Sequence, residues 1–581
     1  MPKTNGGRGR GANSNGQSVY GIKKLRELIL ELAVRGKLVP QDSNDLPASI
    51  LLEKIAKEKA RLIKEGNIKK QKPLPEISED EKPFALPVGW GWSRLGDLGD
   101  WGAGSTPERK NPAYYGGDMN WFKSGELKYN EHLTSSEETV TSEALERCSL
   151  RICHPGDVLI AMYGATIGML AILENDATTN QAVCACTCHT GLFNRFLFLI
   201  LRAWGPRFNE QGAGGAQPNI SKVKIINTIT PLPPLAEQHR IVAKVDELMA
   251  LCDQLEQQQI ESSDTHQTLV KTLLATLTNA ADQKECAKAW QRIANHFDTL
   301  FTTEQSIDQL KQTILQLAVM GKLVPQDPND LPAPQPGKWL EGEIKAGRTR
   351  QAGEPASVLL KKIAKEKERL IKEGKIKKNK PLPGISEDEK PFELPAGWDV
   401  VRFGKIINLI SGQHLKPQEY SETKEPKMIP YLTGPAEFGE HYPETTRFTY
   451  MRRALASAGD ILITCKGSGV GKLNSANTEI AISRQLMSIQ PIIADPNYIK
   501  LLLQSMNESL RARIVGIAIP GISREDITEA IVKLPPLPEQ HRIVAKVDEL
   551  MAICDALKAR LNEAQTTQVQ LADAIVEQAV A

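Results

Sequence analysis

The sequence lacks several features that would assign it quickly to a class. No apolar run approaches the roughly 18 residues that a membrane span needs, and the opening MPKTNGGRGRGANSNGQS lacks the apolar core of a secretory signal peptide. The nine cysteines include no CxxC pair and are odd in number, which fits a reducing compartment. The formal net charge is only +2, so no global basic field indicates a nucleic-acid or membrane partner. We therefore expect a cytoplasmic protein.

Catalytic signatures are missing as well, since no HExxH or GxSxG motif occurs. Residues 111–114 (NPAY) and 495–498 (DPNY) resemble the Asn-Pro-Pro-Tyr loop of adenine methyltransferases, but both lack the second proline and neither lies beside a glycine-rich cofactor turn. Residues 466–472 (KGSGVGK) approach a phosphate-binding loop, yet Leu473 stands where that motif needs Ser or Thr, and we favour a tight hairpin. We predict a non-catalytic chain that holds no cofactor of its own.

One cluster of cysteines is compatible with a metal. Cys184, Cys186 and Cys188 alternate along the chain and are followed by His189. Spacing by two places three thiols on one face of a strand, which suits a metal site or, equally, a buried strand in which cysteine acts as a small hydrophobe. We favour the buried strand and predict no metal.

A duplicated segment dominates what is present. Residues 237–250 and 539–552 are identical, and each follows a Leu-Pro-Pro-Leu run that holds the backbone extended. Glu237-Gln238 and Glu539-Gln540 place negative charge at the start of a helix, where it is favourable. Apolar residues then recur every three or four positions, which predicts coiled-coil helices that continue to about residues 278 and 581. These seam positions are Ile241, Val245, Leu248, Cys252 and Leu255, and Ile543, Val547, Leu550, Cys554 and Leu557.

A second block is repeated upstream of each of these helices. Residues 25–49 match 310–334 and residues 50–90 match 358–398, so residues 335–357 are an insertion in the second copy. Both copies carry a lysine-rich stretch, at 54–72 and 362–380. Such a stretch can lie along phosphates, but we favour a solvated helix face with interleaved glutamates. Each copy ends in Leu-Pro-x-Gly-Trp, which is typical of the entrance to a new domain.

Two divergent segments lie between the repeats and share a faint skeleton. Residues 154–168 match 457–471 in a Gly-Asp turn, a short apolar strand and a glycine-punctuated return. Residues 120–128 match 430–438, and residues 216–225 match 518–527. Lys and Arg number 12 against 14 Asp and Glu over 93–230, and 15 against 14 over 399–532. That balance argues against strong DNA binding by these domains alone but not against selective binding.

The domain organisation that follows is a fixed pair of repeats around two variable inserts. The predicted regions are a disordered leader (1–20), a helical repeat (21–90), a first recognition domain (91–230), a central coiled-coil helix (231–280), a linker (281–306), a second helical repeat with its insertion (307–398), a second recognition domain (399–532) and a C-terminal coiled-coil helix (533–581).

Polar and aromatic side chains among glycines in the inserts are candidates for reading base edges and positioning phosphates. For Trp121 and Tyr431 we favour the competing interpretation as core aromatics. The candidates are Ser105, Thr106, Tyr115, Trp121, Lys123, Ser124, Tyr163, Gln217 and Asn219 in the first insert, and Ser411, Gln413, His414, Tyr431, Thr433, Lys466, Ser468, Arg484 and Ser523 in the second.

The duplicated LPPLAEQHRIVAKVDELM segment, the two divergent inserts and the opening GSTPERKNPAYYGGDMNWFKSGELK resemble the specificity (S) subunits of type I restriction-modification systems. The LAVRGKLVPQD block is similar to the larger enterobacterial subfamily. The resemblance implies an α+β fold with two pseudo-two-fold-related target-recognition domains, which are mixed α/β with short strands and are separated by long antiparallel coiled-coil helices.

The resemblance also implies partners. It indicates a double-stranded DNA target in two specific halves, two modification subunits that methylate adenine with S-adenosylmethionine, and two motor-nuclease subunits that use ATP and Mg²⁺. Those cofactors would belong to the partners. Two other functions stay open at this point, a self-contained DNA methyltransferase or nuclease and a coiled-coil scaffold that does not read DNA.

Overall fold

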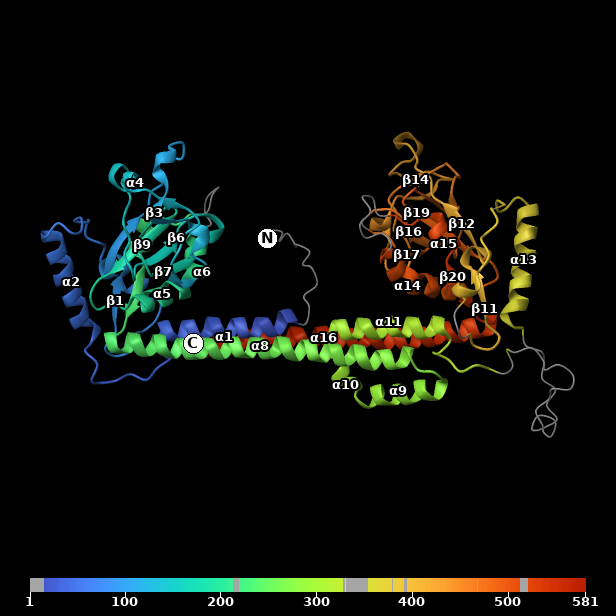
Figure 1. Cartoon of the computed structure of the whole chain (residues 1–581), viewed down its shortest axis with the longest axis horizontal. Coiled ribbons are helices and arrows are strands. Elements are labelled where there is room, and N and C mark those ends of the chain that lie inside the picture. The colour runs from blue at the N-terminus through green and yellow to red at the C-terminus, as the bar shows by residue number, and fades with distance from the viewer. Residues whose placement is uncertain are drawn as a thin grey trace. The chain divides into compact units, whose positions relative to one another are not determined.

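The computed structural model describes residues 15–212, 219–327, 330, 354–378, 380–390, 394–467, 469–512 and 521–580. They fall into two compact units. Unit 1 comprises the chain up to residue 263 together with residues 565 onward, and unit 2 comprises residues 264–564. Each unit contains a sheet-based domain and a set of helices (Figure 1). The predicted mixture of short-stranded α/β domains and long helices is confirmed.

Unit 1 holds the first recognition domain. Its helices are α1 (Asn15–Val34), α2 (Ala48–Lys64), α3 (Leu95–Leu98), α4 (Ser142–Arg147), α5 (Asn194–Ala203), α6 (Gly205–Gly212), α7 (Lys222–Asn227) and the first part of α8 (Leu235–Thr278). Its strands are β1 (Gly91–Arg94), β2 (Gly99–Ala103), β3 (Tyr115–Phe122), β4 (Asn130–Leu133), β5 (Thr139–Val140), β6 (Val158–Ala161), β7 (Leu170–Leu173), β8 (Ala177–Thr179), β9 (Val183–Cys188) and β10 (Ile229–Leu232). The sheets run β1-β10, β2-β9-β6-β7-β4 and β5-β3-β8.

Unit 2 holds the second recognition domain. Its helices are α9 (Gln283–Asn295), α10 (Phe297–Leu300), α11 (Glu304–Met320), α13 (Ala356–Lys372), α14 (Pro496–Ala512), α15 (Arg524–Thr528) and the first part of α16 (Leu537–Val580). Its strands are β11 (Asp399–Arg402), β12 (Ile407–Ser411), β13 (Ile429–Leu432), β14 (Phe448–Thr449), β15 (Leu455–Ala456), β16 (Ile461–Thr464), β17 (Leu473–Ser475), β18 (Ile480–Ile482), β19 (Leu486–Pro491) and β20 (Ile531–Leu534). The sheets run β11-β20, β12-β19-β16-β17 and β14-β13-β18-β15.

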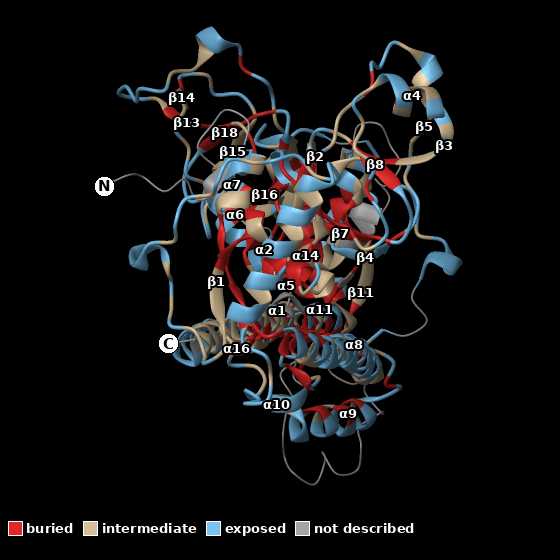
Figure 2. Ribbon diagram, turned by 90° about the vertical axis from the view of Figure 1, so that its left-hand side faces the viewer, coloured by how far each residue is buried: buried red, intermediate tan, exposed pale blue. Residues whose placement is uncertain are grey.

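The two domains share one strand skeleton. The chain enters and leaves each through an antiparallel pair, with Gly91 opposite Leu232 and Asp399 opposite Leu534. The parallel pairs β3-β8 and β13-β18 align Phe122 with Thr179 and Leu432 with Ile482, which confirms the predicted match of 120–128 to 430–438. Figure 2 shows buried segments within each domain, and the central strands β6, β7, β16 and β18 are buried along their whole length.

The predicted long helices are confirmed, since α8 and α16 each span 44 residues. In unit 1 the apolar seam of α8 packs on α1. Ile29 and Ala33 of α1 share a core with Ile241, Val245 and Cys252 of α8, and Leu248 is partly buried. In unit 2 the seam packs on α11, where Ile307 and Ile314 share a core with Ile543, Val547 and Cys554, and Leu550 and Leu557 are partly buried. Each seam therefore finds a helical partner within its own unit.

The predicted seam is one position too long in unit 1. Leu255 is 49% exposed. At that turn α1 presents Arg26, whose guanidinium donates to Asp253 at 2.6 Å and to Glu256 at 3.1 Å. Asp253 and Glu256, which flank Leu255 in sequence, are thus engaged in polar contacts with α1.

The repeated Glu-Gln pair that opens each long helix is buried. The Glu237 carboxylate accepts hydrogen bonds from Trp90 Nε1 at 3.0 Å and Gln41 Nε2 at 2.8 Å, and Glu539 accepts from Trp398 Nε1 at 2.9 Å and Gln326 Nε2 at 2.6 Å. Burial raises the pKa of both carboxyls. The glutamate thus ties the Leu-Pro-x-Gly-Trp entrance to the start of the long helix.

The adjacent glutamine ties the recognition domain to the same helix. Gln238 Oε1 accepts from the Phe193 amide at 2.8 Å, and Gln540 Oε1 accepts from the Asp495 amide at 2.9 Å. Each side-chain amide also donates to a carbonyl of the preceding Pro-Pro run, Pro233 or Pro535. Both glutamine side chains are buried, so each bond replaces one that water would otherwise supply to them.

A lysine and an arginine attach the helical repeat to each domain. Lys59 Nζ donates to the Gly96 carbonyl at 3.0 Å, and Lys367 Nζ donates to the Gly404 carbonyl at 2.6 Å and the Ile407 carbonyl at 2.9 Å. Arg94 binds the Pro75 and Asn227 carbonyls and the Glu81 carboxylate. Its counterpart Arg402 binds the carbonyls of residues 384 and 529 and the carboxylate of residue 389 in the same way.

Two predicted boundaries differ from the structure. Helix α1 begins at Asn15, inside the predicted leader, whose residues 1–14 lie outside the described ranges. The predicted linker 281–306 contains α9 and α10, and Cys286, Ala289 and Ile293 of α9 are buried in the core of unit 2. The helix was missed because charged residues occupy its outer face. Residues 335–353 of the predicted insertion also lie outside the described ranges.

Removing the glutamine tie is expected to destabilise both units alike. Gln238→Ala and Gln540→Ala each leave a buried backbone N–H unpaired, and each should cost about 2 kcal/mol, which appears as a lower urea midpoint. Gln257→Ala is the matched control, because Gln257 lies on α8 but is exposed. Midpoints equal to that of the control would refute the tie.

The contact of Lys367 with the recognition domain in unit 2 predicts a dependence of stability on pH. Burial lowers the pKa of Lys367 to about 8 from 10.5. The unfolded chain then binds the lysine proton more tightly than the folded chain. The unfolding free energy of the wild type, measured relative to Lys367→Met, should therefore rise between pH 8 and pH 10.5, and this gain should be lost as the pH falls back to 8. Urea titrations of both proteins across that range measure the difference. A difference in unfolding free energy that does not change with pH would contradict the lowered pKa of Lys367.

Candidate nucleic-acid interface

Four loops meet at one end of the sheets in each unit, and the same backbone hydrogen bonds join them. The Met162 amide donates to the Ala182 carbonyl, as Cys465 donates to Gln485, both at 2.7 Å. Asn180 likewise donates to the Phe122 carbonyl at 3.0 Å, and its counterpart at 483 donates to 432 at 2.9 Å. Gly104 and Gly412 donate to the first residues of β9 and β19, both at 3.0 Å. We call this end of each domain the loop edge.

Side chains at equivalent places on the loop edge differ between the units. These places follow β2 or β12, follow β3 or β13, follow β6 or β16, and precede β9 or β19. Unit 1 places Ser105, Lys123, Tyr163 and Gln181 there, and unit 2 places Gln413, Thr433, Lys466 and Arg484. All eight are exposed or half-exposed. One backbone frame therefore presents two different sets of hydrogen-bonding groups.

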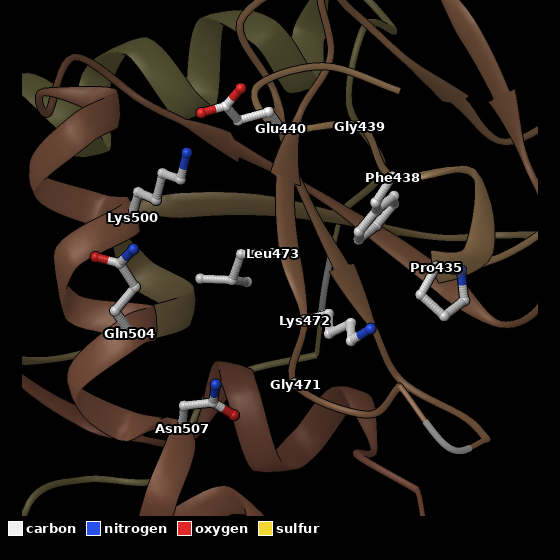
Figure 3. Close-up of a pocket in the computed structure, with 10 residues that line it drawn as sticks. All are labelled: Pro435, Phe438, Gly439, Glu440, Gly471, Lys472, Leu473, Lys500, Gln504 and Asn507. Atoms are coloured by element: carbon white, nitrogen blue, oxygen red, sulfur yellow. The ribbon is translucent and has the colours of Figure 1, made fainter. Parts of the chain in front are cut away.

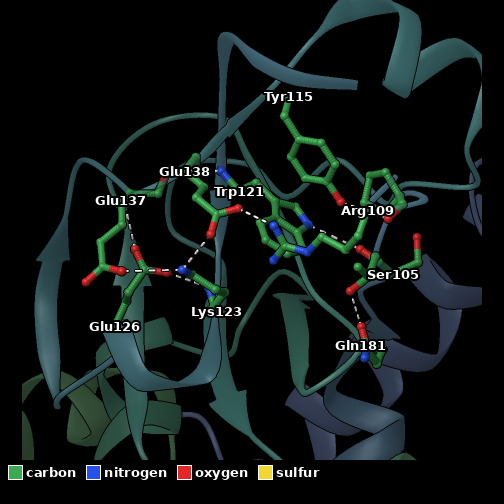
Figure 4. Close-up of polar contacts among 12 residues, drawn as sticks. Ser105, Arg109, Tyr115, Trp121, Lys123, Glu126, Glu137, Glu138 and Gln181 are labelled. Atoms are coloured by element: carbon green, nitrogen blue, oxygen red, sulfur yellow. Dashed lines mark hydrogen bonds and ion pairs between the residues drawn. The ribbon is translucent and has the colours of Figure 1, made fainter. Parts of the chain in front are cut away.

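The loop edge of unit 1 carries an aromatic and charged network (Figure 4). The Arg109 guanidinium lies over the rings of Trp121 and Tyr115, at 4.7 and 5.0 Å from their centroids, and donates to Glu138 at 2.5 Å. Lys123 Nζ donates to Glu138 at 2.9 Å. These two cations lower the pKa of the Glu138 carboxyl, Lys123 more strongly, and Glu138 raises the pKa of Lys123. Both cations of this edge are thus neutralised by carboxylates.

The loop edge of unit 2 has a different charge. Lys466 and Arg484 are exposed, and neither has a carboxylate partner among the described residues. Thr433 donates to Glu437 at 2.8 Å and accepts from Arg447 at 2.9 Å. Ser411 at the end of β12 is exposed, as are Gln413 and His414 on the loop that follows. This edge carries two cations without carboxylate partners among the described residues, at places where unit 1 has Tyr163 and Gln181.

The structure assigns several predicted residues to structural roles. Trp121 and Tyr431 are 0% and 1% exposed, so their competing interpretation as core aromatics is favoured. Trp121 Nε1 donates to the Ser105 carbonyl, and the Tyr431 hydroxyl accepts from the Leu415 amide. Tyr115 is half-buried and donates to the Pro107 carbonyl at 2.7 Å. Buried rings cannot reach a base, but they fix the loops that carry the exposed side chains.

Other candidates lie close to the loop edge. Tyr163 is 43% exposed and forms an isolated antiparallel bridge with the exposed Asn219, and Lys466 forms the same bridge with Gly521. Ser523 is a helix cap, because its hydroxyl accepts from the Asp526 amide. Ser124 begins a short 3-10 turn. Gln217 and Ser468 lie outside the described residues.

Sequence reasoning missed Gln181 and Arg109. Gln181 lies opposite Thr106, whose hydroxyl donates to its side-chain oxygen. The offset of 303 that matches 154–168 to 457–471 also carries Gln181 onto the predicted Arg484, so the signal was present in the sequence. Arg109 gave no signal, because its stacking on Trp121 depends on the path of the loop.

The motifs weighed as catalytic serve as turns. In the 466–472 stretch the amides of Val470, Gly471 and Lys472 donate to carbonyls of the same hairpin, so they do not point at a phosphate. The favoured hairpin is confirmed. An open pocket of about 480 Å³ beside it is lined by Lys472 of the hairpin and by Lys500, Gln504 and Asn507 of α14 (Figure 3). At the NPAY stretch, Asn111 caps a turn by accepting from the Ala113 amide.

The cysteine cluster is a buried strand, as favoured. Cys184 and Cys186 on β9 are 0% exposed, and burial raises the pKa of Cys184 to about 12. Across the described ranges, His, Cys, Asp and Glu form no group of three or more that is placed to hold a metal ion. Among the helices described, none combines the length and the hydropathy that a bilayer crossing needs.

Two domains with one loop frame and different edge side chains define a protein with two distinct recognition surfaces. The family described as "Type I restriction modification DNA specificity domain" matches residues 87–262 and 395–566, once in each half. Two Escherichia coli proteins align along nearly the whole chain. The EcoAI specificity subunit is 39% identical over 98% of this chain and 96% of its own length, and the EcoEI specificity subunit is 38% identical over the same shares.

The chain therefore belongs to the type I restriction-modification DNA specificity family. The solved HsdS subunit from Thermoanaerobacter tengcongensis is 21% identical, with a TM-score of 0.42, over 86% of this chain and 98% of that one.

Proposed function

We propose that this chain is the DNA-reading subunit of a type I restriction-modification complex, and that each loop edge reads one half of a bipartite, asymmetric target. The observation that carries the proposal is the difference in side chains on a shared frame. Unit 1 places Lys123 and Gln181 where unit 2 places Thr433 and Arg484. Amide and guanidinium groups bond adenine and guanine edges, respectively, in the major groove.

The proposed chemistry of the complex is divided among subunits. This chain supplies sequence recognition, and methylation of adenine and ATP-dependent cleavage belong to partner subunits that carry S-adenosylmethionine, ATP and Mg²⁺. We propose two modification subunits and two restriction subunits for each chain. The identical residues 237–250 and 539–552 support two equivalent docking faces, because identical partners need identical surfaces.

Adenine-methylation mapping tests the proposal directly. Cells expressing this chain with its cognate modification subunit should methylate a split, asymmetric motif that cells with the modification subunit alone do not. Genomic sequencing that detects methyladenine gives both half-sites at once. A short continuous motif, or methylation independent of this chain, would reject the two-reader proposal.

Single substitutions at the loop edges should alter one half-site at a time. Arg484→Ala should relax base preference in one half and Gln181→Ala in the other, each by about 1–3 kcal/mol of discrimination at the affected base pair. Mapping of methylated motifs in cells expressing each variant measures the change. Gln291→Ala is the control, because Gln291 is an exposed residue of α9 and lies outside the recognition domain. Altered preference in both halves from one substitution would contradict independent reading.

A further inference from the structure

We propose that the lysine-rich stretch repeated in both units binds backbone phosphates of the DNA next to each half-site. This rests on the proposed function and adds a sequence-independent contact to it. The lysine tract, as we call it, follows α2 in unit 1 and α13 in unit 2. It comprises Lys64, Lys69, Lys70 and Lys72 in the first copy, and Lys372, Lys377, Lys378 and Lys380 in the second.

The first observation is that the tract repeats while the readers diverge. Residues 64–72 read KEGNIKKQK and residues 372–380 read KEGKIKKNK, so all four lysines recur at an offset of 308. At the loop edges every one of the four equivalent places differs between the units. Side chains that are the same in both units are suited to a ligand that is the same at both half-sites. The phosphate backbone has that property, and the base sequence does not.

The second observation is that these lysines are free. All eight are exposed, and none has an acidic partner among the described residues. The arginines of the same helices are paired, since Arg61 contacts Glu65 at 3.2 Å and Arg369 contacts Glu373 at 2.5 Å. The interleaved glutamates therefore compensate the arginines and leave the tract uncompensated. We therefore propose phosphate contact for the tract in place of the solvated-face interpretation.

The third observation is that the tract is held in place from both sides. Before it, Ile55 of α2 and Ile363 of α13 are buried, and Lys59 and Lys367 are bonded to carbonyls of the recognition domain. After it, Arg94 binds the Pro75 carbonyl in unit 1 at 2.7 Å, and its counterpart binds the Gly384 carbonyl in unit 2 at 2.8 Å. Leu74 also lies against Gly96. A tract anchored at both ends keeps its charges at a fixed position on the domain.

The recognition domains need such a contribution. Their Lys and Arg nearly equal their Asp and Glu, and in unit 1 both cations of the network around Trp121 are tied to Glu138. Phosphate contacts supply most of the sequence-independent affinity for DNA, and each lysine that contacts a phosphate releases a counterion. Lysine suits this role, since it is a flexible point charge without the planar geometry that base reading requires.

The test compares two double substitutions that remove equal charge. Lys69→Gln with Lys70→Gln removes two free cations of the tract. Arg61→Gln with Lys82→Gln removes two cations of the same repeat that are paired with Glu65 and Glu79. Each full-length variant is purified in complex with its modification subunits. Its affinity is measured against salt concentration on a duplex carrying the mapped target and on an unrelated duplex.

Log affinity falls as log salt rises, so the slope is negative. The tract variant should reduce the magnitude of this slope by about 1.8, or about 0.9 for each lysine, and equally on both duplexes. Lys377→Gln with Lys378→Gln should do the same, and the two tract variants combined should reduce the magnitude by about 3.6. The paired-cation control should leave the slope near that of the wild type. Because the tract side chains are exposed, thermal unfolding of the tract variants should be unchanged.

Three results would overturn the proposal. An unchanged slope shows that the tract does not touch phosphate. A change on the target duplex alone shows base reading instead. If the tract variant loses the modification subunits during purification while its slope of log affinity against log salt equals that of the wild type, the tract docks an acidic protein surface. If the unsubstituted complex fails to prefer the target duplex, the proposed reading function fails, while the slope on either duplex still tests the tract.

Discussion

The buried Glu-Gln pair at the start of each long helix is the interaction on which each unit depends. Glu237 receives the indole N–H of the domain entrance, and Gln238 receives a backbone N–H of the domain itself. Glu539 and Gln540 make the corresponding bonds in unit 2. Since the four glutamate and glutamine side chains are buried, they depend on the entrance and the domain for their hydrogen bonds. The helix start is thus a joint between three parts of the chain.

This joint lets the inserts vary without altering the frame. The bonds to the glutamine come from backbone amides, Phe193 N–H in one unit and Asp495 N–H in the other, so they place no demand on side-chain identity. The loop edge follows the same rule, because its loops are joined by backbone hydrogen bonds at corresponding positions. Side chains at the edge are then free to differ, which is what a protein with two different recognition surfaces requires.

Several roles were only partly predictable from the sequence. The cysteine strand and the hairpin at 466–472 followed from local pattern, and both are confirmed. Leu255 fits the heptad but is 49% exposed. Trp121 is buried, in agreement with its interpretation as a core aromatic, and the Arg109 guanidinium stacks on its ring. The neighbours that decide burial are distant in sequence, and periodicity carries no information about them.

The sequence by itself determined the duplication, the long helices, the strand matches and the family resemblance, because each depends only on the local spacing of residues or on identical residues. The tertiary structure alone decided the roles of the repeated charges. Glu237 was taken as a favourable charge at a helix start, but it is 1% exposed and accepts two hydrogen bonds from other segments. Lys59 and Lys70 belong to one lysine-rich stretch, yet the first is bonded to the domain and the second is free. Burial and pairing set the role of a charged group, and both depend on the residues that the fold places around it.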